Sequence, residues 1–526
     1  MNNNSNLFCA LRAAFPADLS QVAVDVADGP SAGAAYTWGD LDRGTAMLAN
    51  LLASLGLPEG SRVAVQVEKS VEALMLYLAV LRAGYVFLPL NTAYQAAEIT
   101  YFIGNAEPAV VVCAPKNFAW VSRIAFSAGT AHVFTLGEAC DGTLLERAAH
   151  NGDQHLPAPK RADELAAILY TSGTTGRSKG AMLTHGNLLS NAQTLKHYWD
   201  WQAPDPATGR GGDVLIHALP IFHVHGLFVA SHGALLNGSK MIWFGKFDPR
   251  ATIARMAEAT VLMGVPTLYV RMLAEPTLTR AATAHMRLFI SGSAPLLVET
   301  FDDWISRTDH TLLERYGMSE TVMLTSNPCR KADGPRQRGT VGPALPGVGL
   351  RVMDDHGAPC PAGSIGHIQV SGPNVFIGYW RMPEKTAEEF TADEQGRPWF
   401  KTGDVGQVAA DGCVTIVGRS KDLIISGGYN IYPAEIEAFL NDLPGVAESA
   451  VVGVPHPDFG EGVVAVVVAK PGATLDPAAM IARIKASIAN FKVPKHLFVV
   501  ADLPRNAMGK VQKNLLREQH QGLFAG

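Results

Sequence analysis

Short apolar runs alternate with longer helical patterns through most of the chain, and this alternation restricts the possible folds more than any other feature. Residues 62–67 have the composition of a buried strand, residues 71–83 have helical spacing up to Gly84, and residues 85–90 form the next apolar run. A strand, a helix and a second strand in this order predict a βαβ unit. The predicted fold class is therefore α/β with mostly parallel sheets, in which ligands gather where strands end.

Further apolar runs extend this pattern, and after about Leu350 the spacing and composition of the apolar runs change. Strands are expected at residues 166–170, 214–218, 261–265 and 288–291. Short glycine-rich alternating strands after Leu350, such as 367–370 and 412–417, predict a small β-rich subdomain. A compact α+β pattern follows Lys421, with helices at 434–443 and 477–489 and strands at 450–454 and 463–469. We predict a large N-terminal domain, 1–420, and a small C-terminal domain, 421–526.

Length and charge limit the function classes. At 526 residues the chain exceeds the usual size of one core, so at least two domains are expected. A net charge of −5 gives no general attraction to nucleic acid or to anionic membranes, and no long apolar segment is present. The six cysteines are far apart, without a Cys-x-x-Cys pair, so neither a disulfide framework nor a zinc ribbon is indicated. We expect a soluble cytoplasmic protein; the oligomeric state is left open.

The strongest local signal is a loop rich in glycine and hydroxyl groups that directly follows an apolar strand. Its predicted phosphate-binding residues are Thr171, Ser172, Gly173, Thr174, Thr175, Gly176 and Lys179. Glycines let the backbone approach an anion, hydroxyl and N–H groups can surround phosphate oxygens, and the lysine adds positive charge. The spacing does not fit the P-loop pattern G-x-x-x-x-G-K-[ST], which excludes a P-loop NTPase. The alternative is a hydroxyl-rich surface loop.

At this loop the chain resembles the adenylate-forming superfamily of acyl-CoA synthetases, luciferases and peptide-synthetase adenylation domains, and the likeness covers nearly the whole length. A second matching motif comprises Tyr316, Gly317, Met318, Ser319 and Glu320. The resemblance implies that the hydroxyl contacts the α-phosphate of ATP and that Glu320 helps hold Mg²⁺, although a lone glutamate could equally pair on a helix. Ser319 replaces a threonine that is common there. Ser293 and Ala294, in the turn 291–295, resemble the adenine-binding turn.

Matches continue toward the C-terminus in the order of the superfamily. The resemblance implies that Asp404 and Arg419 bind the ribose, that Lys421 is the hinge, and that Lys510 is the catalytic lysine. Gly427, Gly428 and Tyr429 would line the path of the CoA thiol. Taken alone, Asp404 could stabilise a turn, Arg419 could form a surface ion pair, and Lys510 could be solvated like Lys492, Lys495 and Lys513.

The implied mechanism has two half-reactions, with ATP, Mg²⁺ and coenzyme A. The acid first displaces pyrophosphate from ATP to form an acyl-adenylate, and the thiol of CoA then attacks the adenylate and releases AMP. A cation such as Lys510 would let a carboxylate approach a phosphate. Members of the superfamily rotate a mobile C-terminal domain between the two steps.

Two arginines, Arg271 and Arg315, favour an acid with a second carboxylate, because a guanidinium binds carboxylate bidentately. Segments around His223, Ser291 and Arg315 are similar to malonyl-CoA synthetases. This similarity implies that both arginines bind the distal carboxylate and that His223 and Ser291 shape the pocket. His223 is also predicted to be a catalytic residue. Malonate is therefore the expected substrate, and methylmalonate a second one. Arg271 could instead pair with Glu275 four residues on. The His223-x-His225 pattern could suggest a metal, but no third ligand is evident.

Three rival hypotheses remain at this level. A ligase for acetate or another short acid would not need the arginines. A peptide-synthetase adenylation module would load a carrier protein instead of CoA. A non-catalytic nucleotide-binding protein would not need Asp404, Arg419 and Lys510 together.

Overall fold

The computed structural model describes residues 4–171, 178–204, 211–426, 429–506 and 509–525. The chain divides into two compact units: Met1–Gly349 with Ser371–Pro398, and Leu350–Val370 with Trp399–Gly526. Helices and strands alternate along most of the first unit, which confirms the predicted α/β class. The predicted domain boundary near Lys421 stays a prediction.

The first unit contains an eight-stranded sheet in the order β14-β13-β12-β11-β9-β10-β1-β2. Neighbouring strands from β13 through β12, β11, β9 and β10 to β1 run parallel, so their carboxyl ends lie at one edge of the sheet. The strands are β1 (Val22–Val26), β2 (Ala35–Thr37), β9 (Leu215–His217), β10 (Met241–Trp243), β11 (Val261–Gly264), β12 (Leu288–Ser291), β13 (Leu312–Tyr316) and β14 (Thr325–Ser326). The edge thus carries His217, Ser291 and Arg315, where ligands gather in such sheets.

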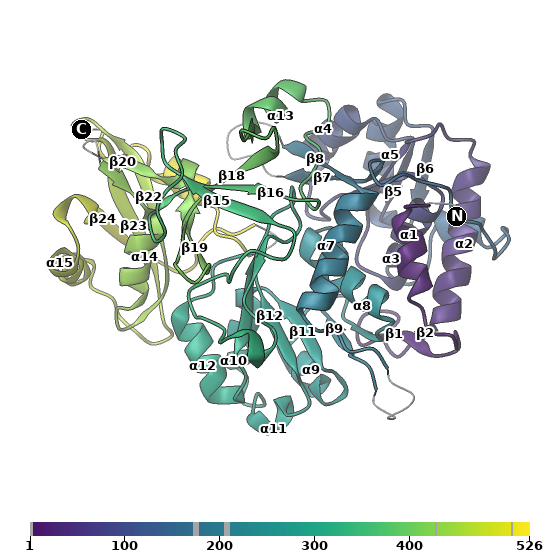
Figure 1. Ribbon diagram of the computed structural model, residues 1–526, viewed down its shortest axis with the longest axis horizontal. Coiled ribbons are helices and arrows are strands. Elements are labelled where there is room, and N and C mark those ends of the chain that lie inside the picture. Colours follow the sequence, from purple (N-terminus) through teal and green to yellow (C-terminus); the bar gives the residue numbers. More distant parts are fainter. Residues whose placement is uncertain (1–3, 172–177, 205–210, 427–428, 507–508, 526) are drawn as a thin grey trace. The chain divides into compact units, whose positions relative to one another are not determined.

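One face of this sheet is covered by short helices (Figure 1). They are α9 (Pro249–Ala254), α10 (Pro266–Leu273), α11 (Arg280–Thr283) and α12 (Val298–Thr308). Tyr269, Phe289 and Trp304 are fully buried in the core that they form with the sheet. Two edge-to-face aromatic contacts, each with ring centroids 5.0 Å apart, fix the position of Trp304 against Tyr269 and Phe289.

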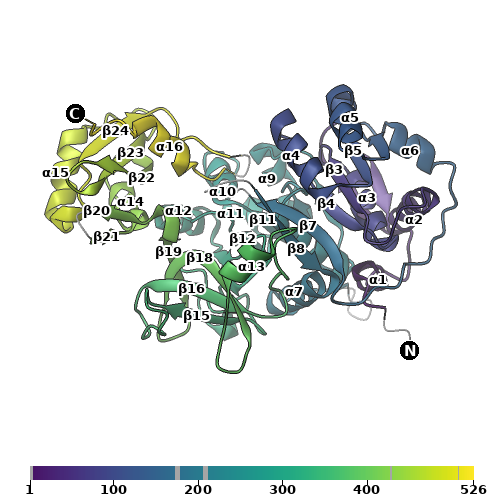
Figure 2. The same ribbon diagram turned by 90° about the horizontal axis from the view of Figure 1, so that it is seen from above.

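A six-stranded sheet in the order β6-β5-β3-β4-β7-β8 forms the rest of the first unit's framework. Its strands are β3 (Arg62–Gln66), β4 (Val86–Pro89), β5 (Val110–Cys113), β6 (His132–Thr135), β7 (Leu165–Thr171) and β8 (Lys179–Thr184). Helices α4 (Ala96–Ala106) and α5 (Phe118–Ser127) pack on one face (Figure 2). Every residue of α3 (Val71–Arg82) is buried, as expected for a helix that is apolar on all sides.

The remaining helices of the first unit are α1 (Leu7–Ala13), α2 (Trp38–Ser54), α6 (Thr143–Ala148), α7 (His185–Tyr198), α8 (His232–Asn237) and α13 (Pro383–Glu389). A π-helical turn, η2 (His225–Ser231), precedes α8. Thr184 caps α7 by accepting from the backbone N–H of Asn187, whose side chain accepts in return from the N–H of Thr184.

The second unit is built on mostly antiparallel sheets, with one parallel pair, β23 and β24, in agreement with the change in sequence pattern after Leu350. Strands β15 (Gly349–Met353), β16 (Gly366–Ser371), β18 (Pro398–Val408) and β19 (Val414–Arg419) form the β-rich part. The C-terminal sheet contains β20 (Ile424–Ser426), β21 (Tyr429–Ile431), β22 (Val446–His456), β23 (Gly460–Ala469) and β24 (His496–Val500). Helices α14 (Pro433–Asn441), α15 (Pro477–Ser487) and α16 (Lys513–His520) complete the α+β pattern.

All six cysteines are free thiols. Within the described residues, no helix combines the length and the apolar character that crossing a bilayer requires.

Candidate active site

Lys179 lies at the start of β8, immediately after the predicted phosphate loop. Thr171 ends β7, and Ser172–Gly176 lie outside the described residues. The Lys179 Nζ atom is 3.6 Å from Glu389 Oε1 and 4.2 Å from the ring centroid of Tyr379. The first unit therefore holds a half-buried lysine against an aromatic ring beside the loop.

The same tyrosine reaches Glu320. The hydroxyl of Tyr379 donates to Glu320 Oε1 over 3.0 Å, and the glutamate is 5% exposed. Tyr379 thus connects Lys179 with Glu320, two residues that the sequence assigned to phosphate and Mg²⁺ binding. A buried carboxylate with a fixed orientation fits a magnesium ion that takes its other ligands from phosphates and water.

The turn before Glu320 is tight. Gly317 leaves no room for a side chain, because a Cβ there would lie 1.9 Å from the carbonyl oxygen of Val322. Val322 itself has a φ of 55°, which is strained for a β-branched residue. Tyr316 to Ser319 are half-buried, whereas the flanking Arg315 and Glu320 are buried. The strain is located where the sequence predicted contact with ATP.

The predicted adenine turn brings Ser293 next to His225. Ser293 has a φ of 72°, and its Oγ is 3.3 Å from His225 Nδ1. Burial, followed by the charge of Arg315, lowers the pKa of His225 well below its usual value, so this imidazole is neutral. Sequence reasoning did not assign His225 to the site; its only signal was the His223-x-His225 pattern.

Arg315 is 3% exposed and its guanidinium packs against the backbone of Gly292. Among the described residues, its Nε and Nη2 atoms have no hydrogen-bond partner. Burial lowers the pKa of Arg315 to about 9, against an opposing effect from Tyr269. A buried guanidinium without an acceptor is unfavourable until an anion arrives.

Glu314 does not neutralise Arg315. Successive side chains of a strand point to opposite faces, so these neighbours in β13 face apart. Burial raises the pKa of Glu314 to about 8, although the backbone N–H of Gly339 opposes this shift. At neutral pH Glu314 is therefore mainly protonated.

This raised pKa predicts a pH-dependent effect of Glu314→Gln on stability. Between the usual glutamate pKa of 4.5 and about 8, the folded state retains a proton that the unfolded state releases. The wild type therefore loses stability with rising pH across that window, by at most about 1.4 kcal/mol per unit. The glutamine variant lacks this loss, so its melting temperature relative to wild type should rise from pH 5 to pH 8.5. A difference that stays constant with pH would contradict the assignment.

The other predicted acid-binding residues differ in exposure. Ser291 is fully buried at the end of β12, and its Oγ has no partner within the described chain. His223 is half-buried, with its ring 4.7 Å from that of Phe222. Arg271, on α10, is exposed. The pair that it could have made with Glu275 is not seen, and Glu275 binds Arg250 over 2.8 Å instead.

In the second unit, Asp404 and Arg419 face each other across the antiparallel strands β18 and β19. The Arg419 Nε atom is 2.7 Å from Asp404 Oδ1, and Asp404 is 3% exposed. This pairing brings together the two residues predicted to bind ribose. Lys421 follows in a short 3₁₀ turn (Ser420–Asp422); its side chain reaches the surface, and partial desolvation, followed by the charge of Arg419, lowers its pKa to about 8.

The last predicted residues lie in the C-terminal part of the second unit. Tyr429 is 56% exposed and stacks on Phe491 at 4.5 Å, whereas Gly427 and Gly428 lie outside the described residues. Lys510 is exposed, and its backbone N–H donates to Asn506 Oδ1 over 3.0 Å. Within the described part of the chain, no group of three or more His, Cys, Asp or Glu side chains could hold a metal by itself.

Comparison with known proteins identifies the family. A family model described as AMP-binding enzyme matches residues 16–380, and one described as AMP-binding enzyme C-terminal domain matches residues 435–510. The chain belongs to the AMP-binding enzyme family. This result confirms the adenylate-forming resemblance inferred from the motifs.

Relatives within the AMP-binding enzyme family span nearly the full chain. The crystal structure of ATP-bound MatB from Rhodopseudomonas palustris has 53% identity and a TM-score of 0.93, covering 99% of this chain and 100% of that one. The malonate–CoA ligase of Arabidopsis thaliana is 34% identical, covering 88% of this chain and 78% of its own. A feruloyl-CoA synthase from Amycolatopsis is also 34% identical, covering 93% and 94%.

Proposed function

We propose that this AMP-binding enzyme is a malonate–CoA ligase, which converts ATP, malonate and CoA to malonyl-CoA, AMP and diphosphate. Methylmalonate is a second substrate. The single observation that carries the choice of acid is the buried guanidinium of Arg315, whose Nε and Nη2 lack acceptors within the described residues. A short diacid supplies the missing acceptor with the carboxylate that does not react.

The surroundings of Arg315 support a small, anionic ligand. The neighbouring imidazole of His225 is neutral and buried, so it adds no competing charge. Glu314 faces away and is protonated, so it does not satisfy the guanidinium. A bidentate carboxylate would gain two charge-assisted hydrogen bonds at this position.

Acetate has no second carboxylate and would leave the guanidinium unpaired, which disfavours the monocarboxylate alternative. The malonate–CoA ligase of Arabidopsis thaliana and the feruloyl-CoA synthase match at the same identity, 34%. These two relatives therefore do not separate the two acids; the higher identity to MatB, 53%, and the charge at position 315 support malonate.

The chemistry proceeds in two steps. A malonate oxygen attacks the α-phosphorus, and the bond from phosphorus to diphosphate breaks. The CoA sulfur then attacks the carbonyl carbon, the bond to AMP breaks, and the thiol proton is released. Lys510 provides positive charge for the first step, and Arg315 holds the distal carboxylate so that the other end reacts. Magnesium, held by Glu320, would neutralise phosphate charge.

We assign the remaining residues as the resemblance implies. Lys421 is the hinge of a mobile domain that begins near residue 421, and Tyr429 with Gly427 and Gly428 guides CoA. Arg271, His223 and Ser291 complete the acid site. ATP is bound by Thr171, Ser172, Gly173, Thr174, Thr175, Gly176, Lys179, Ser293, Ala294, Tyr316, Gly317, Met318, Ser319, Asp404 and Arg419.

Asp404→Asn should weaken the use of ATP. The substitution removes the charge that orients Arg419 and accepts from the ribose hydroxyls, so the KM for ATP should rise about tenfold to a hundredfold. The KM for malonate should stay within about twofold. Steady-state kinetics with each substrate varied checks this, with Asp411→Asn, in the turn before β19, as the matched control. Equal rises of both KM values would contradict the ribose assignment.

A panel of small acids tests the proposed function. Malonate, methylmalonate, acetate, propionate and ferulate are each supplied with ATP, Mg²⁺ and CoA, and the thioester is quantified. The proposal requires the highest kcat/KM for malonate or methylmalonate. A preference for acetate would establish the monocarboxylate alternative, and acyl transfer only to a carrier protein would identify an adenylation module.

A further inference from the structure

Lys69 connects the two sheets of the first unit. It lies just beyond β3 of the six-stranded sheet, and its amine reaches the carboxyl ends of β9 and β10 of the eight-stranded sheet. Lys69 Nζ donates to the carbonyls of His217 and Phe244, both over 2.7 Å, and approaches His217 Nδ1 at 3.0 Å. These three acceptors match the three donors of an ammonium.

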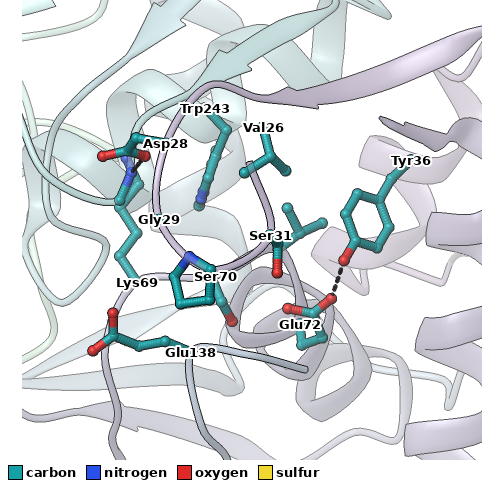
Figure 3. Close-up of a pocket in the computed structure, with 13 residues that line it drawn as sticks. Val26, Asp28, Gly29, Ser31, Tyr36, Lys69, Ser70, Glu72, Glu138 and Trp243 are labelled. Carbon is teal, nitrogen blue, oxygen red and sulfur yellow. Dashed lines mark hydrogen bonds between the residues drawn. The ribbon is translucent and has the colours of Figure 1, made fainter. Parts of the chain in front are cut away.

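The environment of Lys69 is unusual for a lysine. Figure 3 shows its side chain along the wall of a small pocket, near Asp28 and beside Trp243. The amine lies 4.2 Å from the Trp243 ring centroid, and the cavity of about 30 Å³ has room for little more than a water molecule. Burial lowers the pKa of the Lys69 amine well below its usual value, against an opposing effect of Asp28. The buried amine of Lys69 is therefore hydrogen-bonded to protein groups and not to bulk water.

The hydrogen bonds continue through His217. Its Nε2 is 3.0 Å from the carbonyl oxygen of Gly226 and 2.9 Å from Ser231 Oγ. A carbonyl only accepts, so Nε2 carries the hydrogen, and in a neutral imidazole Nδ1 must then accept from Lys69. Burial does keep His217 neutral, because it lowers the pKa well below the usual range. Lys69 therefore fixes the tautomer with which His217 holds Gly226.

Gly226 belongs to the π-helical turn that begins at His225. A Cβ at 226 would lie 2.1 Å from the carbonyl oxygen of Pro220, so this turn packs closely on the segment before it. His225 contacts Ser293, and the charge of Arg315 contributes to the lowered pKa of His225. Single π-helical turns are frequent at functional sites. The turn that His217 holds is thus the one that borders Arg315.

We propose that Lys69 is a positioning residue for the acid-binding site, acting through His217 on the π-helical turn that carries His225. This inference rests on the proposed function, because it takes Arg315 as the anchor of the acid. Without the amine, His217 can change tautomer, the Gly226 carbonyl keeps only the hydrogen bond from Ser231 Oγ at 3.0 Å, and His225 shifts relative to Arg315. Because a displaced site binds the distal carboxylate less tightly, and each tenfold loss of affinity needs only about 1.4 kcal/mol, the KM for malonate rises about tenfold or more.

Three variants and a matched control test this chain of contacts. Lys69→Met removes the donors at similar length, His217→Gln removes the imidazole, and the double variant tests whether the two act together. Lys196→Met is the control, because Lys196 on α7 also donates to a backbone carbonyl, that of Leu236 at 2.7 Å, and also has a pKa lowered by burial. KM and kcat for malonate, KM for ATP and melting temperature are measured for each.

The expected result is a selective rise in the KM for malonate in both single variants, no further rise in the double variant, and KM values for ATP within about twofold. Lys196→Met should lower the melting temperature without changing either KM. An unchanged malonate KM in Lys69→Met, or equal changes in both KM values, would overturn the proposal. If Lys69→Met does not fold, an unchanged malonate KM in His217→Gln overturns it equally. A wild type that forms no malonyl thioester refutes the proposed function alone, and the same comparison is then made with the acid that it uses.

Discussion

Replacing Arg315 by alanine is expected to lower kcat/KM for malonate about a thousandfold, or roughly 4 kcal/mol, while kcat/KM for acetate changes by less than about threefold. The distal carboxylate of malonate would then be desolvated without a cation, because Glu314 faces away and His225 is neutral. Acetate loses no contact. Steady-state thioester formation with each acid at saturating ATP and CoA measures the two effects.

Two control variants separate this effect from general damage. Arg250→Ala removes an exposed arginine that pairs with Glu275, and it should leave both acids unaffected. Arg315→Lys keeps the charge without the planar fork and should recover part of the malonate activity. Equal losses on malonate and acetate, or a rise in the KM for ATP alone, would mean that Arg315 supports the fold or a phosphate and not the acid.

Replacing Lys510 by alanine is expected to lower the rate of adenylate formation at least a hundredfold to a thousandfold. The reason is electrostatic, because two anions must meet in the first step and the variant lacks the cation that we propose for this step. Exchange of labelled pyrophosphate into ATP in the presence of malonate measures this step. Thioester formation from synthetic malonyl-adenylate and CoA should fall by less than about tenfold, because it does not bring a carboxylate to a phosphate.

Lys513→Ala is the matched control for Lys510, since Lys513 lies three residues on and pairs with Glu437 over 2.6 Å. This variant should keep pyrophosphate exchange within about twofold of wild type. Full exchange activity in Lys510→Ala would remove the lysine from the mechanism. Equal losses in both half-reactions would instead indicate that the substitution disturbs the C-terminal part of the chain.

Much of the fold could be predicted from local patterns. The apolar run at 288–291 is β12, and the helical spacing at 71–83 is α3 with its end at Arg82. These elements are decided by periodicity and by glycine at their ends, which act over a few residues. The second unit combines residues 350–370 with residues 399–526. This combination depends on contacts between segments that are distant in the sequence, so no local pattern predicts it.

For the candidate site, the sequence predicted some residues and missed others. Motif order located Glu320 and the pair Asp404 and Arg419, and the structure adds that Tyr379 links Glu320 to Lys179. Residue type alone could not separate buried Arg315 from exposed Arg271, because exposure is set by the packing of β13 and α10. Lys69 carried no sequence signal, because its partners lie 148 and 175 residues away and become neighbours only when the two sheets form.

Under the proposed function, the close contact between Gly292 and Arg315 gives glycine at 292 a part in acid selection alongside the arginine. A Cβ at 292 would lie 2.6 Å from Cζ of Arg315, so even a methyl group would have to displace the cation. Preference among acids can therefore change in a homologue that keeps every charged residue. When substrates are assigned to other sequences of this family, the arginine should be taken as evidence for a diacid only where the residue aligned with position 292 leaves room for the guanidinium.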